Sequence, residues 1–249
     1  MRYWLVMPAA GVGRRFGHTR PKQYAPLQGR TVIEWALAPF LADPGCAGVS
    51  ISLASDDPYW GEVAERLAKL PGRTAEIIVA AGGAERCQSV RQGLEALATH
   101  ATADDWVLVH DAARPCLSAH DLQQLLNRLG SHRVGGILAT PAADTLKRVG
   151  VTVGGSSAAA PEIDQTVDRA GLWRALTPQM FRYQMLSDAL DRALASGRLP
   201  TDEAQALEWT SEHPVLVQGS AANIKITSAD DLVLAAALLN AREHPTSAR

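Results

Sequence analysis

Short apolar runs alternate with amphipathic segments along the first 140 residues, and this alternation limits the fold more than any other feature of the chain. Each run has the length of a strand but lacks the strict alternation of apolar and polar residues that marks a half-buried strand. Between the runs, apolar residues recur at helical spacing. Buried strands separated by helices form a parallel sheet with helical crossovers. The sequence therefore predicts an α/β fold with a doubly wound, Rossmann-like sheet. Strands are expected at Tyr3–Met7, Gly48–Leu53, Glu76–Ala80, Trp106–His110 and Gly136–Thr140, with helices at Thr31–Leu41, Tyr59–Leu70, Ser89–Thr99 and Ser118–Leu129.

The pattern breaks between Asp144 and Val167, where the chain is rich in Gly, Ser and Ala with β-branched residues at the edges. A disordered insert is one interpretation. The other is a β-arm that leaves the body and returns, with Leu146–Val153 pairing with Glu162–Val167. We expect one domain over residues 1–241, with the arm at about 144–168 and a flexible tail at 242–249. The remaining elements are expected as helices at Tyr183–Ala195, Asp202–Thr210 and Ser228–Ala241, and strands at Val215–Gln218 and Asn223–Ile226.

Composition is that of an ordinary globular protein, with 47% hydrophobic and 20% charged residues. No apolar run has the length of a membrane span, and the apolar residues before Pro8 are too few for a signal-peptide core. A cytoplasmic protein without a membrane partner is therefore expected. The three cysteines are odd in number and lack C-x-x-C spacing, which argues against a disulfide framework or a structural zinc site.

Positive charge gathers at the start of the chain. Residues 1–33 hold six of the 24 Lys and Arg residues and none of the 26 Asp and Glu, so this segment carries +6 and the remainder −8. A local positive field on an acidic body suits a small anionic ligand better than a nucleic acid.

The loop Pro8–Lys22 follows the first predicted strand, where ligands bind in open α/β sheets. Small residues at 9, 10, 11 and 13 would let backbone N–H groups approach a ligand. The loop matches neither a P-loop nor G-x-G-x-x-G, and five cationic or histidine side chains crowd it instead. An Arg and a Lys on the α-phosphate of a triphosphate would stabilise charge gathering there. A solvated basic loop is the alternative.

Two further loops follow predicted strands. In "AAGGAERCQSVRQGL", Gly82 and Gly83 signal a turn and Ser89 is expected to cap a helix, or the loop reads a pyrimidine edge through backbone groups. In "VLVHDAARPCL", Asp111 lies just past a strand and is followed by two Ala and an Arg, an arrangement that can hold Mg²⁺ beside a phosphate. A turn or helix-cap role for Asp111 stays open.

Six motifs occur in order over nearly the whole chain: PAAGxGRR with PKQY, GGxERxxSVxxGL, VLVHDAARPC, TVDRxGLWxALTPQ, TDEAxALE and NIKIT. Together they resemble the 2-C-methyl-D-erythritol 4-phosphate cytidylyltransferase family of the non-mevalonate isoprenoid pathway. The resemblance implies a nucleotidyltransferase fold. It also implies a reaction in which CTP and methylerythritol phosphate give diphosphocytidyl-methylerythritol and pyrophosphate, with Mg²⁺ or another divalent cation.

The resemblance also implies roles for individual residues. Arg15 and Lys22 would stabilise the transition state at the α-phosphate, Asp111 would bind Mg²⁺, and Arg169 and Lys225 would hold the sugar phosphate for attack. The CTP site would comprise Pro8, Ala9, Ala10, Gly11, Ala81, Gly82, Gly83, Ser89, Ala112 and Arg114, and the methylerythritol site Thr145 and Thr177. In the family the arm crosses to a second subunit, so a homodimer in which Arg169 serves the partner's site is expected.

The chain departs from the family at Ala84, where an Asp is frequent; the change matters only if that position contributes more than its backbone. Three other functions stay open at this stage. A related nucleotidyltransferase, such as a CDP-ribitol synthase, would differ in its acceptor. An NAD-dependent dehydrogenase lacks support because G-x-G-x-x-G is missing. A non-catalytic nucleotide-binding module would release no pyrophosphate.

Overall fold

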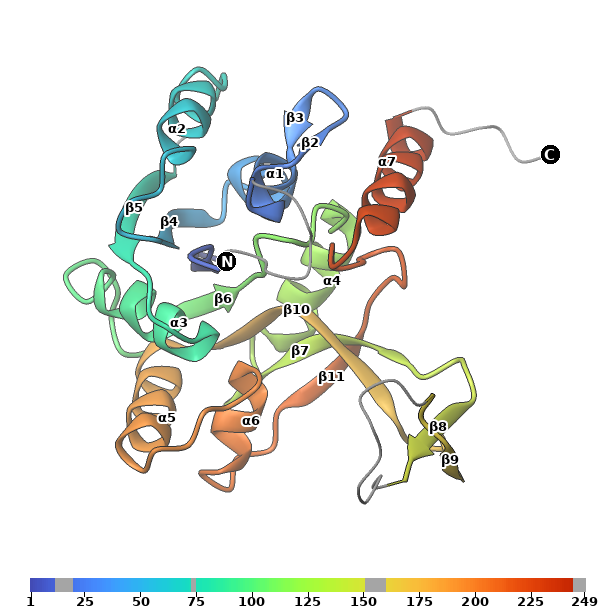
Figure 1. Cartoon of the computed structure of the whole chain (residues 1–249). Helices are drawn as coiled ribbons and strands as arrows, with labels where there is room; N and C mark the ends of the chain where they lie inside the picture. The colour runs from blue at the N-terminus through green and yellow to red at the C-terminus, as the bar shows by residue number, and fades with distance from the viewer. Residues whose placement is uncertain (12–19, 73–74, 151–159, 244–249) are drawn as a thin grey trace.

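A seven-stranded sheet organises the chain in the computed structural model, which describes residues 1–11, 20–72, 75–150 and 160–243 (Figure 1). Its strands are β1 (Tyr3–Pro8), β4 (Cys46–Leu53), β5 (Glu76–Ala81), β6 (Trp106–Val109), β7 (Gly135–Pro141), β10 (Trp173–Arg182) and β11 (Val215–Gln218). They lie in the order β11-β7-β10-β6-β1-β4-β5. Every pair is parallel except those of β10, which runs antiparallel to β6 and β7. The α/β, Rossmann-like prediction is confirmed.

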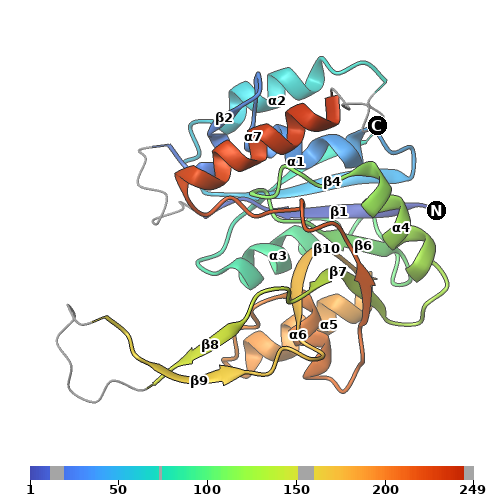
Figure 2. The same cartoon turned by 90° about the vertical axis from the view of Figure 1, so that its right-hand side faces the viewer.

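Helices cover both faces of the sheet (Figure 2). The helices are α1 (Val32–Leu41), α2 (Trp60–Ala68), α3 (Arg86–Glu95), α4 (Ala119–Leu129), α5 (Tyr183–Ala195), α6 (Glu203–Glu208) and α7 (Ala229–Glu243). Apolar side chains of α1, α2 and α4 form one core with the sheet, and those of α3, α5 and α6 form a second core on the opposite face. Leu5 and Met7 of β1 enter the first core and Trp4 and Val6 enter the second, which explains why this strand shows no polar alternation.

A third apolar cluster attaches the C-terminal helix. Ala235 and Leu239 of α7 pack with Val32 of α1 and with a small hairpin of β2 (Pro26–Leu27) and β3 (Arg30–Thr31). This hairpin is not predicted from the sequence, because its strands have only two residues each. No helix among the described residues is long and apolar enough to span a bilayer.

Strand β10 is not predicted from the sequence. The predicted parallel sheet is therefore wrong at this position, where β10 runs antiparallel to both neighbours. The strand carries Pro178 in its middle, and proline lacks the N–H that a central strand must donate. The chain accommodates it at an irregularity between Ala175 and Gln179, where the register against β7 shifts. A proline at a bulge therefore concealed a central strand.

The predicted strand at Asn223–Ile226 is wrong as well, because the chain there is a loop without strand pairing. Its backbone groups bond to the loop after β6: Ile226 N donates to Ala113 O, and Asn223 O accepts from Arg114 Nη1. These contacts tie the segment before α7 to the residues that follow Asp111.

The predicted β-arm is present in its described part. Strands β8 (Leu146–Val149) and β9 (Ile163–Val167) pair antiparallel, with Lys147 opposite Thr166, and the hairpin projects from the body (Figure 2). The expected extension of the first arm strand through 153 falls partly in residues 151–159, outside the described residues. Helix α7 continues through Glu243, past the predicted start of the tail at 242, and residues 244–249 lie outside the described part. The division into one domain, an arm and a tail stays a prediction.

Candidate active site

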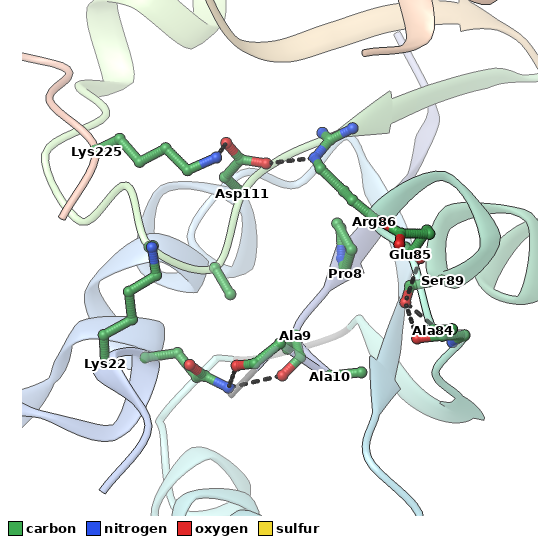
Figure 3. A pocket seen from close by; sticks show the side chains of 15 residues that line it. Pro8, Ala9, Ala10, Lys22, Ala84, Glu85, Arg86, Ser89, Asp111 and Lys225 are labelled. Atoms are coloured by element: carbon green, nitrogen blue, oxygen red, sulfur yellow. Dashed lines mark hydrogen bonds and ion pairs between the residues drawn. The ribbon is translucent and has the colours of Figure 1, made fainter. Parts of the chain in front are cut away.

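A cavity of about 440 Å³ opens at the carboxyl ends of the parallel strands, the edge at which α/β sheets bind ligands (Figure 3). The loop Pro8–Gly11 after β1, the segment Gly83–Arg86 with Ser89 after β5, and Asp111–Ala113 after β6 line it. Lys22, Gln23 and Lys225 complete the lining. Loops distant in the sequence therefore meet at one site, as the strand-end argument predicts.

The side chain of Gln23 fixes the backbone of the loop after β1. Its side-chain Nε2 donates to Ala9 O at 2.7 Å and to Gly11 O at 3.1 Å. Gln23 is 4% exposed, in the short 3-10 helix η2 (Lys22–Tyr24). Gln23 belongs to the motif PKQY, but no role for it is predicted from the sequence. The available signal was a polar residue close to a loop of small residues.

Lys22 reaches the cavity from the same 3-10 helix, and its Nζ donates to Ile226 O at 2.8 Å. The bond links the opening segment of the chain to the loop before α7, which also carries Lys225. Arg15, together with Arg14 and His18 of the same basic stretch, lies outside the described residues.

Ser89 serves the loop after β5 in a different way from that predicted. Helix α3 begins at Arg86, and its capping box is formed by Glu85 and Gln88, so the expectation that Ser89 caps the helix is wrong. Ser89 lies one turn inside, where its Oγ accepts from Gly83 N at 3.0 Å. The side chain is 3% exposed and fixes the Gly83 backbone at the cavity wall.

Asp111 is the charge centre of the site (Figure 3). Its Oδ1 accepts from Arg86 Nε at 2.9 Å, and its Oδ2 lies 2.9 Å from Lys225 Nζ. Arg114 Nε lies 3.5 Å from the same Oδ2. Burial alone would raise the pKa of Asp111, but Arg86, Lys225 and Arg114 hold it well below its usual range. The carboxylate is therefore ionised and surrounded by cations.

Arg86 is itself held by a second carboxylate. Its Nη1 and Nη2 donate to Glu203 Oε1 and Oε2 at 2.6 and 3.1 Å. Burial acts to lower the pKa of Arg86, but the attraction of Glu203 and Asp111 outweighs it and raises the pKa above its ordinary value. Arg86 and Glu203 lie in the motifs GGxERxxSVxxGL and TDEAxALE, but no role for either side chain is predicted from the sequence.

A second cavity, of about 240 Å³, adjoins the first. Both cavities are lined by Arg86, Asp111 and Lys225. These three ion-paired side chains therefore form the boundary between the two cavities. The second cavity adds a polar wall made of Arg114, Thr177, Gln179, Thr201 and Asp202. Two anionic ligands in adjoining cavities would thus share the same cations.

The backbone of Asp111 is anchored by a buried network around His110. Thr177 Oγ1 accepts from Asp111 N at 3.1 Å and lies 2.9 Å from His110 Nδ1. His110 Nε2 lies 3.1 Å from Arg114 O, which can only accept, so Nε2 carries the proton and the Thr177 hydroxyl donates to Nδ1. Burial lowers the pKa of His110 to about 4, in keeping with this neutral tautomer. Asn223 Nδ2 completes the network by donating to Thr177 O at 2.7 Å.

The structure thus brings most of the predicted site residues together. Ala112 lines the first cavity, and Arg114 and Thr177 line the second. Ala81 ends β5, and Gly82 packs behind the loop after β1 without lining the first cavity. Thr145 and Arg169 are exposed at the base of the arm and line neither cavity; Arg169 Nη1 donates to Ala143 O.

Comparison with known proteins decides the family. A family model described as IspD, 2-C-methyl-D-erythritol 4-phosphate cytidylyltransferase, matches residues 3–241. The chain belongs to this family. A 2-C-methyl-D-erythritol 4-phosphate cytidylyltransferase from Halorhodospira halophila is 50% identical over 249 residues, covering 98% of this chain and 97% of that protein. One from Vibrio vulnificus strain CMCP6 is 48% identical over 230 residues, covering 92% and 91%.

Solved structures agree. The Francisella tularensis 2-C-methyl-D-erythritol 4-phosphate cytidylyltransferase superposes with a TM-score of 0.77 at 33% identity, covering 96% of this chain and 100% of that chain. The enzyme of the same name from Thermus thermophilus gives a TM-score of 0.73 at 30% identity, covering 96% and 100%. As a cytidylyltransferase family member, the chain is a nucleotidyltransferase enzyme of isoprenoid biosynthesis.

The site offers few protein ligands to a divalent cation. Among the residues that the structure describes, no three His, Cys, Asp or Glu side chains gather as a metal cage. Mg²⁺ in phosphate-transferring enzymes takes one or two carboxylates and completes its shell with waters and substrate phosphates. Asp111 supplies one such carboxylate at the wall of the larger cavity, so the residues fit a cation shared with a bound nucleotide and do not fit one held by protein alone.

Proposed function

We propose that the chain transfers CMP from CTP to 2-C-methyl-D-erythritol 4-phosphate, with the nucleotide in the larger cavity and the sugar phosphate in the smaller one. The observation that carries the assignment is the common boundary of the two cavities, Arg86, Asp111 and Lys225. An acceptor phosphate is already an ionised nucleophile, so the reaction requires no general base. It requires two anions to be positioned together and their charge to be neutralised.

The cations divide into two groups in this proposal. Lys22, with Arg15 by resemblance, stabilises the charge that develops on the α-phosphate during displacement. Lys225 lines the smaller cavity and holds the acceptor phosphate. Arg114, which the resemblance assigns to CTP, lines the smaller cavity instead of the larger one, so we assign it to the acceptor phosphate as well. The backbone of the loop after β1, fixed by Gln23, and that of Gly83, fixed by Ser89, receive the nucleotide.

Asp111 is proposed to hold Mg²⁺ or another divalent cation together with the CTP phosphates. A cation there would neutralise phosphate charge and polarise the α-phosphate. The chain's own part is to present one ionised carboxylate, which the buried network around Thr177 and His110 anchors through the Asp111 backbone.

A homodimer through the arm is proposed for the acceptor site. In this chain Thr145 and Arg169 lie outside both cavities, although the family resemblance assigns them to the sugar phosphate. The arm exposes apolar side chains, with Val149 at 52% and Ile163 at 64% exposure, which a second copy of the chain would cover. A cytoplasmic location and the absence of nucleic-acid partners stay predictions from the sequence.

The decisive experiment measures pyrophosphate release by the purified protein with CTP, Mg²⁺ and each acceptor of a panel. We expect release with 2-C-methyl-D-erythritol 4-phosphate and a matching ³¹P signal for a diphosphate-linked product. Ribitol 5-phosphate should give little release, and omission of acceptor none. A preference for ribitol 5-phosphate would reassign the acceptor, and no release with any acceptor would overturn the enzymatic assignment.

A further inference from the structure

All three nitrogens of the Arg86 guanidinium bind carboxylate oxygens. Its two terminal nitrogens donate to the two oxygens of Glu203, and its Nε donates to Asp111 Oδ1. A guanidinium is rigid and planar, so a carboxylate gripping both terminal nitrogens fixes the direction of Nε as well. The orientation of Arg86 toward Asp111 is therefore set by Glu203.

Glu203 is suited to this role by its own position. It stands at the first residue of α6, its side chain is 1% exposed, and α6 is fixed by its cap residue Asp202, which accepts from Gln205 N. Gln179 of β10 adds a further tie, because its Oε1 accepts from Ala204 N. Glu203 thus stands behind Arg86, away from the reacting groups, on a backbone secured at both sides.

The charges add a second reason. Arg86 without Glu203 would be free to turn its terminal nitrogens onto Asp111 and bind both carboxylate oxygens, a strong geometry for an Arg–carboxylate pair. Such a pair would occupy the oxygen atoms that a divalent cation needs. Glu203 also cancels one positive charge beside the cavity that receives the triphosphate.

We propose that Glu203 is a positioning residue for the reaction, acting through Arg86: it aims Arg86 Nε at Asp111 Oδ1 and keeps the terminal nitrogens of Arg86 away from Oδ2, where a divalent cation would exchange with Lys225 Nζ. The predicted effect on the Mg²⁺ requirement rests on the proposed function, in which Asp111 binds a cation. The predicted effect on CTP binding without metal does not depend on that role.

The test substitutes Glu203→Gln, which keeps the shape and removes the charge. The Mg²⁺ concentration for half-maximal activity should rise about three- to tenfold, because the released Arg86 competes for Asp111. CTP binding without metal, measured by calorimetry, should tighten by about the same factor, because the cavity wall gains net positive charge. A merely structural role predicts weaker CTP binding and an unshifted Mg²⁺ requirement, and that pair of results would overturn the proposal.

Arg86→Gln tests the direction of the effect. Removing the competitor should lower the Mg²⁺ requirement while turnover falls, because Asp111 loses its orienting partner. The double variant Glu203→Gln, Arg86→Gln should behave as Arg86→Gln alone, since Glu203 acts through Arg86. Additive effects of the two substitutions would overturn the proposal.

Glu34→Gln is the matched control, because Glu34 is also a buried carboxylate that binds two nitrogens of an arginine, Arg66, and it lines neither cavity of the site. It should reproduce any loss of stability without moving the Mg²⁺ requirement. If Glu203→Gln fails to fold, Glu203→Asp replaces it: the shorter carboxylate releases one nitrogen, so the Mg²⁺ requirement should rise with metal-free CTP binding unchanged. If the unmodified enzyme shows no divalent dependence, the proposed metal role of Asp111 and the cation part of the inference both fail. Metal-free CTP binding by Glu203→Gln then decides only whether the charge of Glu203 affects nucleotide binding.

Discussion

Gly82 and Ala10 lie in such close contact that a Cβ built on Gly82 would stand 2.1 Å from the Ala10 Cβ. The same Cβ would stand 2.9 Å from Leu53 O, the carbonyl to which Gly82 N donates. Gly82 therefore supports the loop after β1 from behind without lining the nucleotide cavity. Gly82, in the turn after β5, thus limits how closely the loop after β1 can approach it.

Gly82→Ala should displace Ala10 and its neighbours into the cavity. We expect a destabilisation of about 1–3 kcal/mol, as for other overpacked sites, and a raised Michaelis constant for CTP. Chemical denaturation and steady-state kinetics measure the two effects. Gly61→Ala is the control, because nothing lies within 4 Å of its added Cβ and it should not destabilise the protein. An unchanged Michaelis constant in Gly82→Ala would separate this contact from nucleotide binding.

Lys22→Ala should lower turnover much more than CTP affinity, because the proposed contact strengthens in the transition state. Loss of one such donor typically costs about 10²–10³ in turnover. Arg20→Ala is a matched control from the same basic stretch: Arg20 stacks over Tyr59 and lines a different cavity. Near-normal turnover in Lys22→Ala would remove Lys22 from the mechanism.

Asp111→Asn should shift the activity curve in a Mg²⁺ titration, since an amide of the same shape carries no charge for the cation. The half-saturating concentration should rise and the maximum should fall. The variant also leaves Arg86, Lys225 and Arg114 without their shared carboxylate, so stability is measured alongside. Unchanged half-saturation and maximum would make Asp111 a structural residue.

The sequence predicts the strand ends that build the larger cavity because buried apolar runs mark parallel strands, and ligand sites follow at their carboxyl ends. It does not predict β10, because Pro178 interrupts the strand pattern. The smaller cavity depends on that strand, so residues such as Gln179 could not be placed from local patterns. Its boundary with the nucleotide cavity depends on contacts between distant loops.

The cap residues show how local signals succeed and fail. Ser118, the first residue of the helix predicted at Ser118–Leu129, caps α4, and its side chain accepts from Asp121 N. Ser89 has the same chemistry but lies inside α3, because Glu85 and Gln88 form the capping box earlier in the chain. A serine before an apolar segment therefore indicates a cap only when no better capping pair precedes it.

Acid should destabilise the enzyme through His110. Burial holds its pKa at about 4, while an unfolded histidine titrates near 6.5, so the unfolded state binds an extra proton between these values. The contribution of neutral His110 to the free energy of unfolding is fully present above about pH 6.5 and is lost as pH falls toward 4. The loss amounts to at most about 3 kcal/mol. Urea unfolding between pH 7.5 and 5 measures the slope. In His110→Gln the slope should flatten; the same slope in both proteins would assign the acid sensitivity elsewhere.

Arg169→Ala should raise the Michaelis constant for methylerythritol phosphate with a smaller effect on CTP, if its guanidinium binds the acceptor phosphate. Steady-state kinetics with each substrate varied in turn measure the two Michaelis constants. Equal effects on both substrates would contradict a role confined to the acceptor.

The location of Arg169 can be tested apart from its role. A Lys22→Ala protein and an Arg169→Ala protein are mixed in equal amounts and allowed to exchange subunits, and activity is measured at a methylerythritol phosphate concentration at which each variant alone is nearly inactive. If Arg169 serves the partner's site, each mixed dimer has one site bearing both lesions and one bearing neither. Random pairing makes half of the dimers mixed, so activity should recover toward about a quarter of that of the unmodified enzyme. If Arg169 serves its own subunit, every site keeps one lesion, and exchange proven by mass spectrometry would bring no recovery.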